Sequence, residues 1–273
     1  MPNTLSPQDL ELAKFFTDVE PLRNWFEKAI VADKLPKRLL VIWGVGGIGK
    51  SSLLRMFRLN CKTAHVPVGL ASGDEEKSAV DVLTRWVEDL QNDGANLPIF
   101  SKTLERYRAI QAKVEDQAKA TNKKLGDAMV KGAGKVAEAG AAAAVGAVVG
   151  SVIPGIGTIA GAIGGMGAEA LMDWLRGFLT KPDIDLYTDP SKKVTDDFLA
   201  DVNQLASKQR VVLMLDTYEQ MTALDDWTRD VAKQLNENIL LVIAGRAMVK
   251  WGRKWDSWLI HAQVEELKPM PRR

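Results

Sequence analysis

The sequence predicts an α/β fold in which buried parallel strands alternate with amphipathic helices. Three continuous apolar runs have the length and composition of strands that are buried on both faces. These runs are residues 39–43, 211–215 and 239–244. Apolar residues recur at helical spacing between them, as at residues 52–57 and 78–90. Two further strands are expected, at residues 65–70 and 260–267.

A glycine-rich motif follows the first apolar run. Residues 44–51 fit the pattern G-x-x-x-x-G-K-[ST] and lead directly into a helical segment. Glycines allow successive backbone N–H groups to point inward, and the helix N-terminus adds partial positive charge, so the motif predicts a phosphate-binding loop (P-loop, or Walker A motif). We therefore expect ATP binding with Mg²⁺, in which Lys50 reaches the terminal phosphates and Ser51 binds the metal. The candidate nucleotide-binding residues are Gly44, Val45, Gly46, Gly47, Ile48, Gly49, Lys50, Ser51 and Ser52.

Charged residues follow the second and third apolar runs, and they supply the candidate catalytic residues. Asp216 ends a run of the Walker B form, so its carboxylate is expected to bind Mg²⁺ together with Ser51; the alternative is a turn or helix-cap aspartate. Glu219 is the candidate general base, or else a solvated loop carboxylate. Arg246 is the candidate sensor of the γ-phosphate, or else part of a surface salt bridge.

Composition narrows the function classes. With 273 residues the chain is long enough for one large α/β domain with an insertion, or for two small domains. Its formal net charge of +1 gives no general attraction to nucleic acid, and direct nucleic-acid binding is not expected. The single cysteine, Cys61, excludes an intramolecular disulfide and suits a reducing compartment, so we expect a cytoplasmic protein. The two histidines, His65 and His261, are too far apart in sequence to support a metal site.

The segment from Gly132 to Gly167 differs abruptly from the rest of the chain. It consists almost entirely of Gly, Ala, Val and Ile, and no charged residue occurs between Glu138 and Glu169. Pro154 and Gly155 predict the turn of a helical hairpin, and glycines spaced by four residues would form a glycine zipper. Two interpretations stay open: a tightly packed soluble hairpin, and a membrane-active hairpin that would bring the protein to a membrane surface. Each uncharged arm is shorter than the roughly 20 residues that a membrane-spanning helix needs.

The order of these motifs resembles the STAND class of P-loop NTPases, the NB-ARC- and NACHT-like regulatory ATPases related to AAA proteins. The resemblance is carried by residues 16–22, 44–51, 215–219 and 244–246, and it covers most of 12–99 and 183–270. It implies a three-layer P-loop NTPase with a five-stranded parallel sheet of order 5-1-4-3-2. It also implies that Phe16 and Thr17 contact the base, although Val19 replaces the arginine usual in that upstream motif. Slow ATP turnover would then serve a conformational switch in signal transduction.

We therefore expect the NTPase domain in two parts, residues 1–124 and 182–273, separated by a Gly/Ala-rich hairpin insertion at 125–181. The expected function is a regulatory switch that binds ATP, hydrolyses it weakly and signals by conformational change or self-association. The alternative is a membrane-perturbing effector whose hairpin, with membrane contact through 132–167, is controlled by the ATPase core. A conventional AAA-like motor is a third reading. The chain ends about where the helical lid of the family would begin, so three alternatives are open: a fragment of a longer protein, a truncated gene product, or a minimal member that takes its lid from a lid-bearing protein partner.

Overall fold

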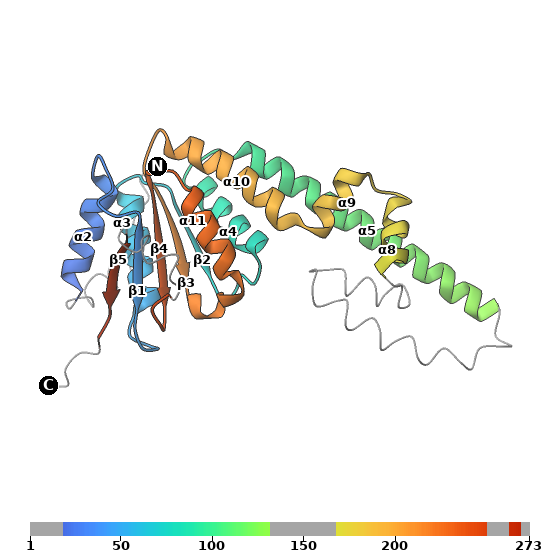
Figure 1. Ribbon diagram of the computed structural model, residues 1–273, viewed down its shortest axis with the longest axis horizontal. Helices are drawn as coiled ribbons and strands as arrows, with labels where there is room; N and C mark the ends of the chain where they lie inside the picture. Colours follow the sequence, from blue (N-terminus) through green and yellow to red (C-terminus); the bar gives the residue numbers. More distant parts are fainter. Residues whose placement is uncertain (1–18, 132–167, 250–261, 269–273) are drawn as a thin grey trace. The chain divides into compact units, whose positions relative to one another are not determined.

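The computed structural model describes residues 19–131, 168–249 and 262–268, which fall into two compact units (Figure 1). The sheet unit comprises residues 1–100 and 195–273, and the helical unit comprises residues 101–194. The expected insertion, 125–181, lies within the range of the helical unit. Most of its Gly/Ala-rich hairpin, residues 132–167, lies outside the described residues, as do the candidate base contacts Phe16 and Thr17.

The sheet unit contains a five-stranded sheet in which all pairings are parallel. Its strands are β1 (Leu39–Trp43), β2 (Val68–Ser72), β3 (Val211–Asp216), β4 (Ile239–Gly245) and β5 (Ala262–Glu266). The spatial order is β2-β3-β4-β1-β5, which is 5-1-4-3-2 when it is read from the β5 edge. The α/β class and the five-stranded parallel sheet predicted from the sequence are confirmed.

Helices cover both faces of this sheet, as Figure 1 shows. Helices α2 (Glu20–Val31) and α3 (Lys50–Thr63) share one core with alternate residues of β1, β3 and β4, and within it Phe26 stacks on Phe57 at 3.9 Å between ring centroids. The other face carries α4 (Ala79–Asn92), α11 (Asp225–Gln234) and the sheet-unit part of α10 (Pro190–Ala206). There Trp86 of α4 contacts Phe198 and Trp227, with centroids 5.8 and 6.2 Å away. On each face of the sheet, aromatic side chains therefore pack the covering helices against one another.

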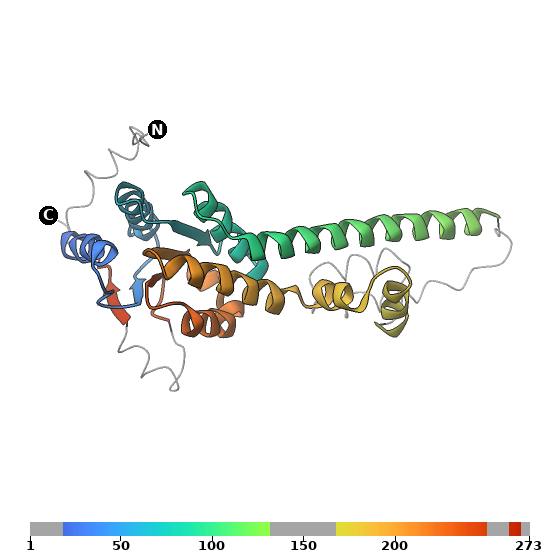
Figure 2. The ribbon, with the colours of Figure 1, turned by 90° about the horizontal axis from the view of Figure 1, so that it is seen from above.

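The helical unit is built on the long helix α5 (Pro98–Lys131), which runs beside α8 (Ala168–Arg176) and α9 (Lys181–Thr188) in Figures 1 and 2. Buried residues recur along α5 at intervals of three or four, as expected for one apolar face of a helix. They are Leu104, Tyr107, Ile110, Val114 and Ala118. Arg106 pairs with Asp183 at 2.6 Å, and Lys113 donates to the Phe178 carbonyl at 2.7 Å. Within the described ranges, no helix has the length and apolar character needed to cross a bilayer.

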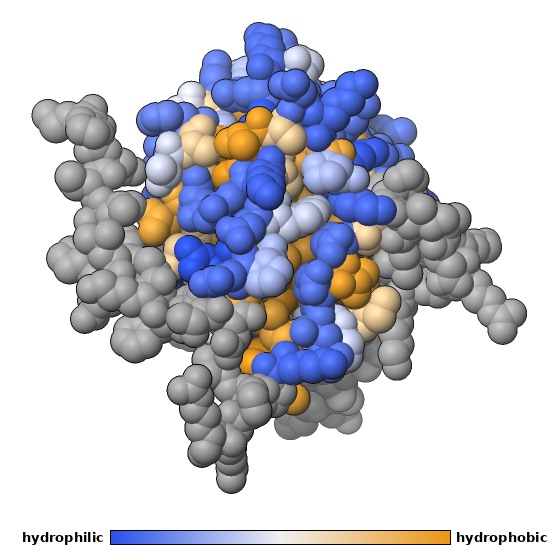
Figure 3. All heavy atoms as spheres, turned by 90° about the vertical axis from the view of Figure 1, so that its left-hand side faces the viewer, coloured by the Kyte–Doolittle hydropathy of each residue, from blue (hydrophilic) through white to orange (hydrophobic). Residues whose placement is uncertain are grey.

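The surface on the α2 side of the sheet unit mixes hydrophilic and hydrophobic residues (Figure 3). Apolar residues are interspersed there among polar ones, and singly exposed apolar side chains are ordinary on folded proteins. The opposite edge of the sheet, at β2, is organised differently.

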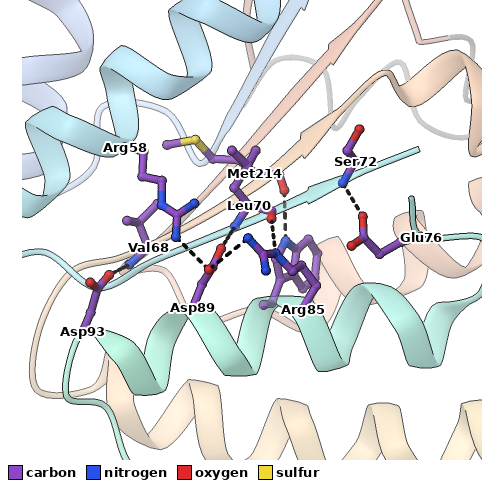
Figure 4. Close-up of polar contacts among 10 residues, drawn as sticks. Arg58, Val68, Leu70, Ser72, Glu76, Arg85, Asp89, Asp93 and Met214 are labelled. Atoms are coloured by element: carbon purple, nitrogen blue, oxygen red, sulfur yellow. Dashed lines mark hydrogen bonds and ion pairs between the residues drawn. The ribbon is translucent and has the colours of Figure 1, made fainter. Parts of the chain in front are cut away.

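Strand β2 is an edge strand whose outward N–H groups are bonded to carboxylates from α4 and its flanking loops (Figure 4). Asp93 accepts from Val68 N at 3.1 Å, Asp89 from Leu70 N at 3.0 Å, and Glu76 from Ser72 N at 2.6 Å. Burial raises the pKa of Glu76, and its hydrogen bond from Ser72 opposes that shift. These three carboxylates occupy the donors that an edge strand would otherwise offer to another chain.

Asp89 is the most buried of the three, with 2% of its side chain exposed. Besides Leu70 it contacts Arg58 of α3 at 2.7 Å and Arg85 at 3.4 Å. One carboxylate therefore connects β2, α3 and α4, and removing its charge would leave a partly buried guanidinium without its partner.

We expect Asp89→Asn to lower the free energy of unfolding by about 2–4 kcal/mol, because breaking a buried ion pair leaves an uncompensated charge. Urea denaturation followed by circular dichroism measures this change. The matched control is Glu88→Gln on the same helix, whose exposed side chain should change stability by less than about 0.5 kcal/mol. Equal stability of the two variants would contradict the assigned role of Asp89.

Candidate nucleotide-binding site

Parallel strand pairing brings the predicted site residues to one edge of the sheet. Trp43 at the end of β1 is paired with Gly245 at the end of β4, and Ser72 at the end of β2 is paired with Asp216 at the end of β3. The 44–51 loop, the turn after Asp216 and Arg246 therefore follow the carboxyl ends of neighbouring strands. This edge is where open parallel α/β sheets bind ligands.

The loop after β1 has the backbone expected of a phosphate-binding loop. Gly47 and Gly49 have φ angles of +76° and +99°, which side-chain-bearing residues rarely adopt, and Gly49 is the N-cap of the 14-residue helix α3. At Gly44 a Cβ atom would lie 2.6 Å from the Leu267 carbonyl oxygen, so only glycine fits there. The loop thus places the N-terminus of a long helix beside an exposed backbone segment at residues 45–47.

Lys50 lies across its own loop. Its Nζ donates to the carbonyls of Gly44 at 2.7 Å and Val45 at 2.9 Å, and only 8% of the residue is exposed. Burial lowers the pKa of Lys50, while the negative charges of Glu219 and Asp216 oppose that shift. The buried ammonium is therefore hydrogen-bonded to neutral carbonyls, and an anionic group at the loop would be a stronger partner for it.

Glu219 and Arg246, predicted separately, form an ion pair with each other. Arg246 Nε lies 2.9 Å from one carboxylate oxygen of Glu219, and Arg246 N donates to the other oxygen at 3.0 Å. Arg246 also lies beside the loop, because a Cβ atom on Gly46 would be 3.7 Å from its Nε. The alternative considered for Arg246, a surface salt bridge, is thus present, and its partner is the candidate base.

Asp216 and Ser51 are the two candidate metal ligands. Asp216 ends β3, is half-buried and accepts a hydrogen bond from Thr217 N at 2.8 Å. Ser51 is exposed in the first turn of α3, and Ser52 beside it is half-buried. The described residues contain no cluster of three His, Cys, Asp or Glu side chains suited to a metal ion. One carboxylate and one hydroxyl suit Mg²⁺, which commonly keeps waters and binds phosphate oxygens for its remaining positions.

Sequence reasoning missed the contribution of the loop between β2 and α4. Asp74 accepts hydrogen bonds from Thr217 Oγ1 at 3.2 Å and from Gln220 Nε2 at 2.6 Å, on either side of Glu219 in the chain. The acidic run at residues 74–76, which begins four residues after the end of the strand expected at 65–70, was the available signal. The run reaches the turn after β3 because β2 pairs with β3, a neighbour relation that only the family resemblance had implied.

A strand, a glycine loop and a helix in this order, within a five-stranded parallel sheet, define the architecture of the site. This arrangement is consistent with a P-loop NTPase fold. No family model matches the chain, and no curated protein matches its sequence. Among solved structures the chain is similar to Cdc6p from Pyrobaculum aerophilum, with a TM-score of 0.38 and 11% sequence identity over 98% of this chain. The match spans 47% of that protein's chain, and at this distance it indicates no shared function.

We expect Gly47→Ala to lower the free energy of unfolding by about 1 kcal/mol relative to Gly46→Ala. Neither added methyl group is crowded, since Gly47 faces open space and Gly46 has its nearest neighbour at 3.7 Å, but only Gly47 has a left-handed φ. Urea denaturation without nucleotide measures the difference. Equal stabilities would show that the left-handed conformation at Gly47 is not required.

Proposed function

We propose that this protein is an ATP-binding regulatory switch of the STAND type that hydrolyses ATP slowly. The observation that carries the proposal is geometric: the ion pair of Glu219 with Arg246 lies beside Gly46 of the glycine loop, and Lys50 is buried across the same loop. A buried lysine at the start of a helix, two carboxylates and an arginine at one sheet edge are the groups that phosphoryl transfer from ATP requires.

Each residue has a distinct proposed role. The N–H groups of the 44–51 loop and Lys50 would bind the phosphates, and Ser51 and Asp216 would hold Mg²⁺. When bound, Mg²⁺ would neutralise phosphate charge. Glu219 would orient a water molecule and accept its proton, and its ion pair with Arg246 fixes the direction of the carboxylate.

The switch itself is proposed to act through Arg246. Its guanidinium lies between the loop, at Gly46, and the carboxylate of Glu219. A terminal phosphate at the loop would compete with Glu219 for the same cation, so ATP and ADP would leave the turn after β3 in different states. Self-association, or contact with a lid-bearing partner, would respond to that difference. Phe16 and Thr17 remain candidate base contacts by resemblance only.

Lys50→Ala is expected to abolish ATP binding, because the loop loses its buried cation, whereas Glu219→Gln should keep binding and lower turnover by about 100-fold or more. Nucleotide titration and phosphate release measure the two effects. Lys62→Ala, at the far end of the same helix, and Glu75→Gln, an exposed carboxylate of the β2–α4 loop, are matched controls. ATP binding by Lys50→Ala would refute the proposed function, and full turnover by Glu219→Gln would remove Glu219 from its role.

Arg246→Ala is expected to reduce the preference for ATP over ADP by about tenfold, because a charge-assisted hydrogen bond to the terminal phosphate is lost. Affinities for both nucleotides, together with particle mass in each, measure this discrimination. Arg55→Ala, an exposed arginine on α3, serves as the control. If Arg246→Ala left the ratio of ATP affinity to ADP affinity unchanged, the proposed sensing role would be contradicted. The same holds if its particle mass in ATP and in ADP matched that of the wild type.

A further inference from the structure

The turn that carries Glu219 has contacts on two sides. Arg246 lies on one side, and the loop of residues 73–77, between β2 and α4, lies on the other. This loop has no part in the mechanism above, yet it makes several polar contacts with the turn at residues 217–221.

The backbone of the loop packs directly against this turn. Gly73 N donates to the Asp216 carbonyl at 2.9 Å, and a Cβ atom on Gly73 would lie 2.5 Å from the Thr217 carbonyl oxygen. Any residue other than glycine at position 73 would therefore displace the turn. The two segments are held at a separation that leaves no room for a side chain.

The turn has an uncommon conformation where the loop contacts it. Thr217 has a φ of +50°, in the left-handed region, which is unfavourable for a β-branched residue. Surrounding contacts must hold such a conformation in place. Asp74 supplies one of these contacts, since it accepts from the Thr217 hydroxyl at 3.2 Å.

Gln220, the residue after Glu219, is bonded to the loop through both ends of its side-chain amide. Its Nε2 donates to Asp74 at 2.6 Å, and its Oε1 accepts from Lys77 Nζ at 3.2 Å. Lys77 also donates to the Gly73 carbonyl. We call the contacts among Asp74, Lys77 and Gln220 the Gln220 network. In this network the Gln220 NH₂ group faces an acceptor, Asp74, and its carbonyl oxygen faces a donor, Lys77. The amide is therefore fixed in one orientation, because the reversed amide would place its NH₂ group against the ammonium of Lys77.

We propose that the Gln220 network positions Glu219 for catalysis, so that Asp74, Lys77 and Gln220 are positioning residues of the ATPase. The network holds the residue on one side of Glu219, and Asp74 with Gly73 holds Thr217 on the other. Glu219 lies between two anchored residues, and its carboxylate is directed toward Arg246 and the P-loop. This inference rests on the proposed function, since it presumes that Glu219 acts on a water molecule.

A donor–acceptor exchange tests the proposal. Gln220→Glu places two carboxylates where a hydrogen bond of 2.6 Å now exists, whereas the double variant Asp74→Asn/Gln220→Glu restores that bond with donor and acceptor exchanged. We expect Gln220→Glu to lower the rate of single-turnover ATP hydrolysis by about tenfold and to change ATP affinity by less than about twofold. In the double variant the rate of hydrolysis should recover to within about twofold of wild type. Glu75→Gln, which changes an exposed carboxylate of the same loop outside the network, is the control and is expected to remain near wild type.

Hydrogen exchange of residues 217–221 provides a second readout that does not depend on activity. Gln220→Glu should exchange faster there than wild type, the double variant should not, and exchange in β3 and β4 should stay unchanged if the variants are folded. Faster exchange in Gln220→Glu with full hydrolysis would overturn the positioning role, as would failure of the double variant to recover.

These results separate the two proposals. Wild-type turnover no higher than that of Lys50→Ala would refute the proposed function, and it would refute the positioning of Glu219 for hydrolysis at the same time. Slow hydrolysis by Gln220→Glu that the double variant restores supports both. Normal wild-type turnover with an unaffected Gln220→Glu keeps the function and overturns this inference alone.

Discussion

The in-register parallel pairing of β2, β3, β4 and β1 is the constraint on which the site depends. Trp43 is paired with Gly245 and Ser72 with Asp216, and the β3–β4 register, in which Leu215 is paired with Ile243, brings these two pairs to within one residue of each other. Four separate loops therefore begin at one edge of the sheet. A shift of one residue in any pairing would move a loop by about 3.3 Å and reverse which face each side chain occupies. The buried residues on both faces of the sheet therefore fix the site geometry as much as they fix stability.

The turn after β3 gains its conformation from what surrounds it rather than from its own sequence. Thr217 is a poor residue for a left-handed conformation, and the η2 segment (Tyr218–Gln220) is a single short turn. Glu219 is bonded to Arg246 on the β4 side, and Gln220 is bonded to the β2–α4 loop. A change at either neighbour would therefore be transmitted to the carboxylate between them, which is what a nucleotide-dependent switch requires.

Much of the fold could be predicted from the sequence because its signals are local. The apolar runs at β1, β3 and β4 are continuous, and the glycine loop fixes the start of α3 by its own spacing. The expected strand at 65–70 instead begins at Val68, because the preceding residues cap the end of α3: His65 has a left-handed φ of +56°, and Val66 N bonds back to the Cys61 carbonyl. The Glu219–Arg246 pair was not predicted, since residues 27 positions apart meet only through the β3–β4 pairing.

Two carboxylates of the sheet unit, Asp89 on α4 and Asp216 at the end of β3, have different surroundings that composition cannot distinguish. Asp89 is buried, and its oxygens bind two arginines and the N–H of an edge strand, so its charge is already compensated within the protein. Asp216 is only half-buried, follows a strand at the edge that carries the glycine loop, and accepts from the N–H of its own neighbour. A carboxylate compensated by protein groups stabilises a fold, whereas one beside a buried lysine and an exposed glycine loop can still bind a cation. Strand position and burial, rather than residue type, therefore distinguish the structural carboxylate Asp89 from Asp216, which we propose as a metal ligand.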